Sequence, residues 1–111
     1  MKYKNKHVLI VGYGESGKSS QEFLLNHKAN VFLYDDNKKV FNSLKFDNKK
    51  VTILEKFDEE IIKQFHFVVL SPGVSKYSEI IKLATFNNVP VISELQLGLD
   101  NIKGRVIAII G

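Results

Sequence analysis

Short apolar runs alternate with longer amphipathic stretches along the whole chain. Runs of this length, bounded by glycine or polar residues, are typical of strands that are buried on both faces of a sheet. The pattern therefore predicts buried strands rather than strands with one wet face. They are expected at 7–11, 31–34, 51–54, 67–70, 91–92 and 106–110.

Helical periodicity fills the intervals between the predicted strands. In the stretch 58–65, Asp58 stands where a helix N-cap is expected, and Ile61, Ile62 and Phe65 share one helical face. An aspartate in that position accepts a hydrogen bond from a free backbone N–H of the first turn. The pattern predicts helices at 18–27, 38–45, 58–65 and 77–87.

The alternation of strand and helix decides the fold class. Connections that contain a helix join parallel strands through right-handed crossovers, whereas antiparallel neighbours can be joined by tight hairpins. We therefore predict an α/β fold, a Rossmann-like doubly wound parallel sheet of about five strands with helices on both faces. The polar stretch 100–105 marks a seam, and the strand expected at 106–110 lacks a covering helix.

Composition excludes several classes of function. Hydrophobic residues make up 44% and charged residues 25% of the chain, values that argue against disorder and fibrous repeats. The net charge is +4, but the lysines are dispersed and no aromatic stacking motifs lie between them, so no nucleic-acid partner is expected. The apolar run behind the basic N-terminus is too short for a signal peptide or a membrane span. Cysteine is absent, which fits a reducing cytoplasm.

The spacing of the residues predicts neither a metal site nor a catalytic nucleophile. His7, His27 and His66 fall in separate elements without metal-ligand spacing, so no metal site is expected. No pairing of a nucleophile with a base is evident.

The first predicted strand leads into a glycine loop, Gly12-Tyr13-Gly14-Glu15-Ser16-Gly17, which opens the first helix. In this context Gly12 permits a tight turn, Gly14 lets the backbone approach a phosphate, and Gly17 allows close packing of helix on strand. Backbone N–H groups at a helix start attract anions. Asp35, at the end of the second strand, is expected to accept hydrogen bonds from a ribose or a base. Tyr13 is expected either to stack on a ligand or to be exposed.

Two alternatives remain open for this loop. An NAD-binding domain of a dehydrogenase or regulatory protein shares the glycines, with Asp35 on the ribose hydroxyl. Gly12-x-x-x-x-Gly17-Lys18-Ser19 also has the spacing of a P-loop nucleotidase. The P-loop hypothesis gives no function to the Ser71-Pro72-Gly73 turn. We therefore favour the interpretation that Lys18 is a solvated lysine in the first turn of the helix.

The fourth predicted strand runs into Ser71-Pro72-Gly73. In an open parallel sheet the carboxyl ends of the strands form the ligand crevice, so this turn is expected beside the glycine loop. Pro72 stiffens the turn, and Gly73 allows the backbone to lie close to a ligand. Ser75 or Ser78 is expected to cap the next helix.

Four segments taken together resemble UDP-N-acetylmuramoyl-L-alanine:D-glutamate ligases of the Mur ligase family. They are Val8 to Gly17, Val69-Leu70-Ser71-Pro72-Gly73-Val74, Ile92-Ser93-Glu94-Leu95-Gln96-Leu97-Gly98, and Val106 to Gly111. The resemblance spans nearly the whole chain in the same order. It implies that 1–93 is the UDP-substrate-binding Rossmann-like domain, and that 94–111 is a linker and the first strand of a truncated central ATPase domain.

The resemblance also implies which residues hold the substrate. Gly14, Glu15 and Ser16 would line the diphosphate, while Gly73 would touch the nucleotide sugar through its backbone. Glu15 departs from expectation by placing a negative charge beside the diphosphate, and Asp36 stands where the family often has a neutral or hydroxyl residue. The expected UDP-binding residues are Gly14, Glu15, Ser16, Gly17, Asp35, Asp36, Asn37, Ser71 and Gly73.

The reaction of this family implies what cofactors, partners and activity to expect. ATP and Mg²⁺ serve to phosphorylate the alanine carboxylate of UDP-N-acetylmuramoyl-L-alanine, and the amine of D-glutamate then attacks the acyl phosphate. The ATP loop would begin at Gly111. No catalytic residue is expected within 1–111, and no cofactor is expected to be bound to this chain alone. A cytoplasmic monomer without ligase activity of its own is expected.

Overall fold

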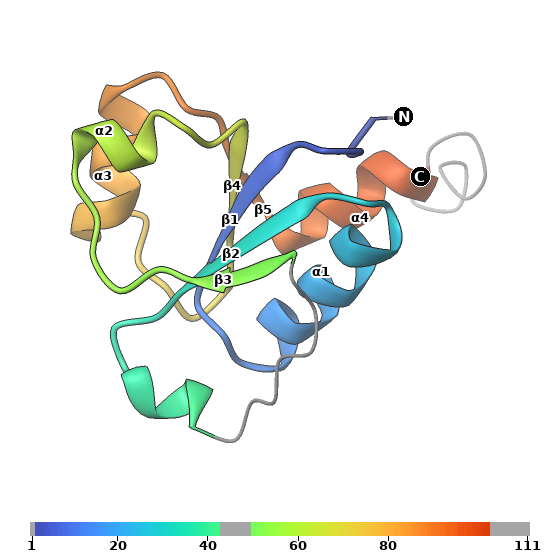
Figure 1. Cartoon of the computed structure of the whole chain (residues 1–111), viewed down its shortest axis with the longest axis horizontal. Helices are drawn as coiled ribbons and strands as arrows, with labels where there is room; N and C mark the ends of the chain where they lie inside the picture. Colours follow the sequence, from blue (N-terminus) through green and yellow to red (C-terminus); the bar gives the residue numbers. More distant parts are fainter. Residues whose placement is uncertain (1, 43–49, 103–111) are drawn as a thin grey trace, which may run out of the picture.

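The chain folds around one five-stranded parallel sheet, described here in a computed structural model for residues 2–42 and 50–102 (Figure 1). The strands are β1 (His7–Val11), β2 (Asn30–Tyr34), β3 (Val51–Ile53), β4 (Phe67–Leu70) and β5 (Val91–Ser93). The helices are α1 (Glu15–Asn26), the 3-10 helix η1 (Lys38–Phe41), α2 (Glu59–Ile62), α3 (Glu79–Phe86) and α4 (Glu94–Ile102).

The strand order is β3-β2-β1-β4-β5, and every neighbouring pair is parallel. The chain moves outward from β1 to β2 and β3, and then crosses back to place β4 on the other side of β1. This reversal creates a switch point between β1 and β4, where the loops that follow the two strands diverge. In open α/β sheets that is the place where ligands bind.

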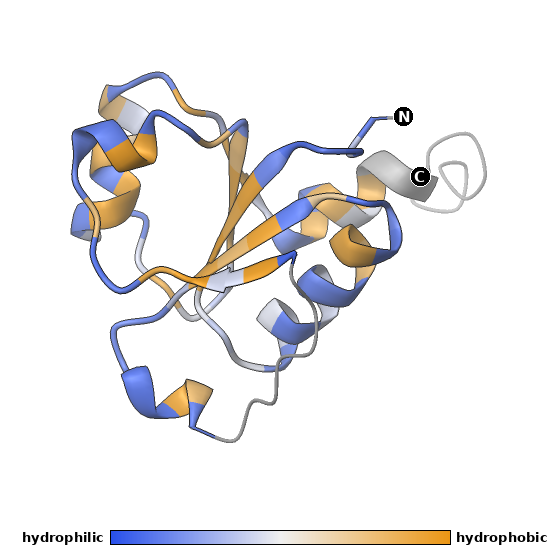
Figure 2. Cartoon of the chain, in the orientation of Figure 1, coloured by the Kyte–Doolittle hydropathy of each residue, from blue (hydrophilic) through white to orange (hydrophobic). Residues whose placement is uncertain are grey.

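The central strand β1 contributes to both layers of the core. Val8 and Ile10 pack on the face covered by α1 and α4, and Leu9 and Val11 pack on the face covered by α2 and α3. All four side chains are buried, because side chains alternate across a strand and both faces of this sheet are covered. Figure 2 shows the resulting band of hydrophobic residues along the strands and the inner sides of the helices.

The predicted fold class is confirmed, with helices on both faces of a five-stranded parallel sheet. The N-cap prediction for Asp58 is also confirmed, since its carboxylate accepts a hydrogen bond of 2.9 Å from the Ile61 N–H. The helix predicted at 38–45 begins as η1, in which Asn37 accepts from the Lys39 N–H at 3.2 Å, and 43–45 lie outside the described residues. The predicted strand 106–110 also lies outside them.

Residues 94–102 form a helix that packs on the sheet. Ser93 caps it, with its Oγ accepting from the Gln96 N–H at 3.0 Å, and Leu97 is buried in the core layer that includes Leu24 of α1. The division of the chain at residue 93 stays a prediction. Among the described helices, none is long and apolar enough to cross a membrane.

Candidate functional site

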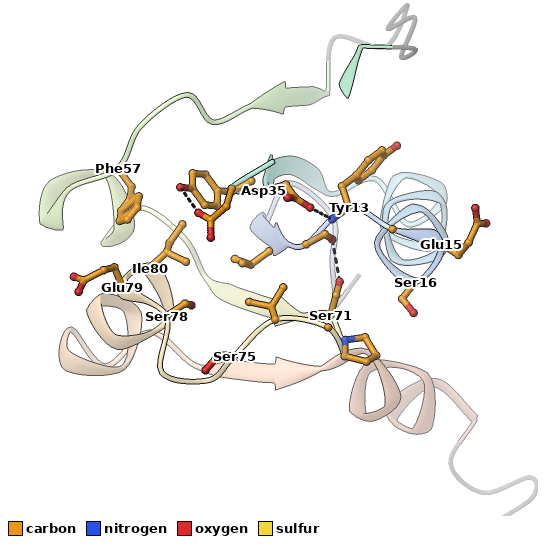
Figure 3. A pocket seen from close by; sticks show the side chains of 18 residues that line it. Tyr13, Glu15, Ser16, Asp35, Phe57, Ser71, Ser75, Ser78, Glu79 and Ile80 are labelled. Carbon is orange, nitrogen blue, oxygen red and sulfur yellow. Dashed lines mark hydrogen bonds between the residues drawn. The ribbon is translucent and has the colours of Figure 1, made fainter. Parts of the chain in front are cut away.

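A cleft of about 650 Å³ opens at the switch point of the sheet (Figure 3). Cavities of this size hold small organic ligands and cofactors in other proteins. Its lining comes from the glycine loop after β1, the end of β2, the segment before α2, and the turn between β4 and α3. The lining residues are Val11, Gly12, Tyr13, Gly14, Glu15, Ser16, Tyr34, Asp35, Asp36, Phe57, Ser71, Pro72, Gly73, Val74, Ser75, Ser78, Glu79 and Ile80.

Most of the residues predicted to bind ligand come together in this cleft. Gly14, Glu15, Ser16, Asp35, Asp36, Ser71 and Gly73 line it, and two of the predicted residues do not. Gly17 is buried in the first turn of α1, and Asn37 is exposed beside η1, where its side chain serves as the cap. Gly17 packs closely against the preceding turn, as predicted, and Asn37 caps η1, while contact of either residue with a ligand stays a prediction.

The glycines of the loop differ in what surrounds them. Gly12 has a φ of +96°, and a Cβ added to it would lie 2.7 Å from Val74 Cγ2. A Cβ on Gly17 would lie 2.3 Å from the carbonyl oxygen of Gly12, so the start of α1 touches the turn that precedes it. Gly14 is different, because a Cβ there would find no atom within 4 Å. Two glycines thus shape the loop, and the third leaves open space at the cleft.

Helix α1 begins directly at the cleft. Gly14 is its exposed N-cap residue, and no side chain caps the helix there. The backbone N–H groups of the first helical turn have no partner within a helix, and together with the helix dipole they favour an anion. The open space at Gly14 lets such an anion approach the backbone.

Asp35 holds the glycine loop against the end of β2. Its Oδ2 accepts from the Tyr13 N–H at 2.8 Å, and its Oδ1 accepts from the Asn37 N–H at 2.8 Å. The Gly12 N–H also donates to the Tyr34 carbonyl at 2.8 Å. Each carboxylate oxygen has a further lone pair, so Asp35 can still accept from a ligand hydroxyl while it fixes the loop. The sequence indicated only the ligand contact.

Ser71 connects the two loops that form the cleft. Its hydroxyl donates to the Gly12 carbonyl at 2.9 Å, and its backbone N–H donates to the Val11 carbonyl at 3.1 Å. The residue is 6% exposed. The hydroxyl therefore positions the glycine loop from within the wall of the cleft.

Replacing Ser71 by alanine is expected to lower the free energy of unfolding by about 1–2 kcal/mol, because the buried Gly12 carbonyl loses its hydroxyl donor. Urea unfolding followed by circular dichroism measures the change. Ser75→Ala is the matched control, since the Ser75 hydroxyl accepts from the exposed Tyr77 N–H. Equal unfolding free energies for the two variants would contradict the positioning role of Ser71.

The expectation that the Tyr13 side chain stacks on a ligand or is exposed is wrong. Its side chain neither stacks in the cleft nor is exposed: it is 4% exposed, packed in the core with its ring centroid 5.4 Å from that of Phe41. Burial raises the pKa of the Tyr13 phenol above its usual value. The ring anchors the loop, because apolar area removed from water stabilises this conformation.

The same loop does not have the arrangement of a P-loop. Helix α1 already begins at Glu15, so the three residues before Lys18 are helical instead of wrapping around a phosphate. The Lys18 ammonium lies 3.9 Å from the Glu15 carboxylate and 5.9 Å from the centre of the Tyr13 ring. Neither Lys18 nor Ser19 lines the cleft, and both are exposed. The residues present do not fit ATP with Mg²⁺ at this loop.

The charged side chains that line the described part of the cleft are all acidic. Four carboxylates line it, from Glu15, Asp35, Asp36 and Glu79, and no lysine or arginine does among the residues that the structure describes. An anion at the glycine loop must therefore rely on the backbone N–H groups of α1, and nearby acidic side chains oppose it.

Sequence reasoning missed the other end of the cleft. Figure 3 shows Glu15 and Ser16 at one end and Phe57, Ser78, Glu79 and Ile80 at the opposite end. The ring of Tyr34 lies edge-on to that of Phe57, with centroids 5.4 Å apart. Phe57 follows β3 in a segment without regular structure, so no periodic pattern marked it as part of a site.

Comparison with known proteins assigns the chain to a family. Residues 6–93 match the family model described as "Mur ligase MurD-like, N-terminal domain". UDP-N-acetylmuramoylalanine–D-glutamate ligase of Oenococcus oeni is 37% identical over 111 residues, which are 100% of this chain and 23% of that protein. The enzyme of the same name from Lachnospira eligens is 38% identical, over 100% of this chain and 26% of its own length. The chain thus spans about a quarter of the length of these relatives.

Solved structures with the same fold are more distant in sequence. Shikimate dehydrogenase of Aquifex aeolicus superposes with a TM-score of 0.56 at 18% identity, covering 86% of this chain and 45% of the dehydrogenase. A chorismate mutase/shikimate 5-dehydrogenase fusion protein of Clostridium acetobutylicum gives 0.53 at 15% identity, over 83% of this chain and 43% of its own. At these identities the likeness concerns the fold alone. The family match instead covers both loops of the cleft, and the chain belongs to the Mur ligase family, in its MurD-like N-terminal domain.

Proposed function

We propose that the cleft binds the UDP portion of UDP-N-acetylmuramoyl-L-alanine. The observation that carries this proposal is the exposed start of α1 at Gly14, which offers unpaired backbone N–H groups to a diphosphate at the switch point of the sheet. Gly14 and Ser16 would contact the diphosphate. Asp35, Asp36 and Gly73 would contact the nucleoside.

The substrate would serve a ligase reaction in the longer protein. There ATP and Mg²⁺ would convert the alanine carboxylate to an acyl phosphate, and D-glutamate would attack it to form an amide. Gly111, the expected start of the ATP loop, lies outside the described residues. The function of residues 1–93 would be to hold and orient the substrate, and we expect no amide formation by this chain alone.

NAD is the second candidate ligand. Asp35 follows β2, where an acidic partner for a ribose hydroxyl lies in dinucleotide-binding domains, and Gly12 has the positive φ of a tight glycine turn. The two candidates share the diphosphate and differ in the groups attached to it.

Calorimetric titration of the chain with UDP-N-acetylmuramoyl-L-alanine, UDP, NAD and ATP-Mg²⁺ separates the hypotheses. The proposal predicts saturable binding of both uridine ligands and weaker or undetectable binding of NAD and ATP. Tight NAD binding without a preference for uridine would overturn it.

Replacing Glu15 by glutamine is expected to strengthen UDP binding roughly two- to fivefold at low ionic strength, because it removes a negative charge from the first turn of α1. The gain should shrink at high salt, where exposed charges are screened. Glu22→Gln is the matched control, since Glu22 is exposed on the same helix and does not line the cleft. Equal gains from both variants would show that net charge, not proximity to the diphosphate, is responsible.

A further inference from the structure

The end of the cleft away from the glycine loop is built around two aromatic rings. Tyr34 ends β2 and Phe57 precedes α2, and their ring planes meet at 87° with centroids 5.4 Å apart. Both rings are partly buried and line the cleft, and both pack against the core layer beneath α2 and α3. The nearly buried Ile80 of α3 completes this apolar surface.

Polar contacts hold the Tyr34 ring in place. Its hydroxyl donates to Asp36 Oδ1 at 3.0 Å, and burial, followed by this hydrogen bond and the charges of Asp36 and Asp35, raises the pKa of the phenol. The Lys38 ammonium lies 5.1 Å from the centre of the ring and donates to the Glu55 carbonyl at 2.9 Å. Lys38 thereby connects the end of β2 with the segment that carries Phe57.

The two aromatic rings and the nearby carboxylates at this end of the cleft favour binding of a planar heterocycle over binding of an anionic group. A diphosphate at Gly14 leaves the opposite end of the cleft for the nucleoside, and aromatic side chains stabilise a base through its flat face. A phosphate or carboxylate at that end would meet Asp36 and Glu79, both acidic.

We propose that Tyr34 and Phe57 form an aromatic wall that holds the nucleobase of the ligand. This inference rests on the proposed uridine nucleotide function and adds to it the side chains responsible for affinity toward the base. Asp36 accepts from the Tyr34 hydroxyl through Oδ1, and the lone pairs of Oδ2 can accept an N–H from the edge of the base, with or without that hydroxyl.

The wall can be tested in the 111-residue chain with two ligands, UDP and the base-free ribose 5-diphosphate. Phe57→Leu and Tyr34→Leu remove a ring and keep an apolar side chain, whereas Phe57→Tyr and Tyr34→Phe keep the ring. We expect each leucine variant to bind UDP roughly tenfold more weakly, and the ring-retaining variants to stay within about twofold of the parent chain. Ribose 5-diphosphate should bind all of them equally. Amide NMR spectra confirm that each variant is folded.

A second measurement does not depend on the affinity of the base-free ligand. Intermolecular NOEs are expected between the uracil H5 and H6 protons and the Phe57 ring, assigned by their loss in Phe57→Leu. If UDP binds but the leucine variants bind it as the parent chain does, or lose both ligands equally, the wall is overturned while the proposed function stands. If the parent chain shows no uridine binding, the proposed function fails and the wall fails with it.

Discussion

Replacement of Gly17 by alanine is expected to lower the free energy of unfolding by about 3 kcal/mol or more. The added Cβ would lie 2.3 Å from the carbonyl oxygen of Gly12, and the obstacle is backbone that is itself held by Tyr34 and Ser71. The turn cannot shift without breaking those hydrogen bonds. Because a domain of this size is stable by only about 5–15 kcal/mol, the variant would lose a large share of its stability.

Gly98→Ala is the matched control for this prediction. Gly98 also lies in a helix, α4, but a Cβ there meets no atom within 4 Å. The same substitution should therefore raise stability by about 0.5–1 kcal/mol, through the helix propensity of alanine. Urea unfolding of both variants gives the two free energies. If Gly17→Ala were as stable as Gly98→Ala, the close contact between α1 and the glycine turn would be wrong.

Replacement of Gly14 by valine is expected to weaken UDP binding at least about tenfold, or about 1.4 kcal/mol, while the fold is retained. The open space around Gly14 accepts a side chain, and its φ of −92° suits any L residue. The same side chain would keep a diphosphate away from the backbone N–H groups of α1. Titration calorimetry measures the affinity, and thermal unfolding checks the fold.

Ser19→Ala is the control for the Gly14 variant. Ser19 is exposed on α1 outside the cleft, so its loss should leave UDP binding unchanged. A P-loop would require the Ser19 hydroxyl for metal binding, so ATP-Mg²⁺ binding that is lost in this variant would favour the P-loop hypothesis. Strong UDP binding by Gly14→Val would contradict the position proposed for the diphosphate.

The parts of the fold that the sequence predicted well are those that depend on local pattern. The buried run Val8 to Val11 and the N-cap at Asp58 follow from alternation and hydrogen-bond chemistry within a few residues. The meeting of the glycine loop with the Ser71 turn was also predictable, because parallel strands end at the same edge of a sheet.

The parts that the sequence did not reveal depend on contacts between distant segments. Tyr13 turns inward because Phe41 offers an aromatic partner, and nothing in the glycine loop itself indicates that choice. Phe57 reaches the cleft through its packing on Tyr34, 23 positions earlier in the chain. Asn37 was expected at the ligand, and nothing in the sequence indicated that its side chain caps η1.

Mapping of amide chemical shifts during titration with UDP-N-acetylmuramoyl-L-alanine would show whether the substrate binds at the glycine loop. We expect saturable shifts at the amides of Gly14, Ser16 and Gly73, no comparable shifts at the far ends of the strands, and no displacement of the ligand by NAD at equal concentration. Shifts that avoid the glycine loop, or displacement of the ligand by NAD at equal concentration, would contradict it.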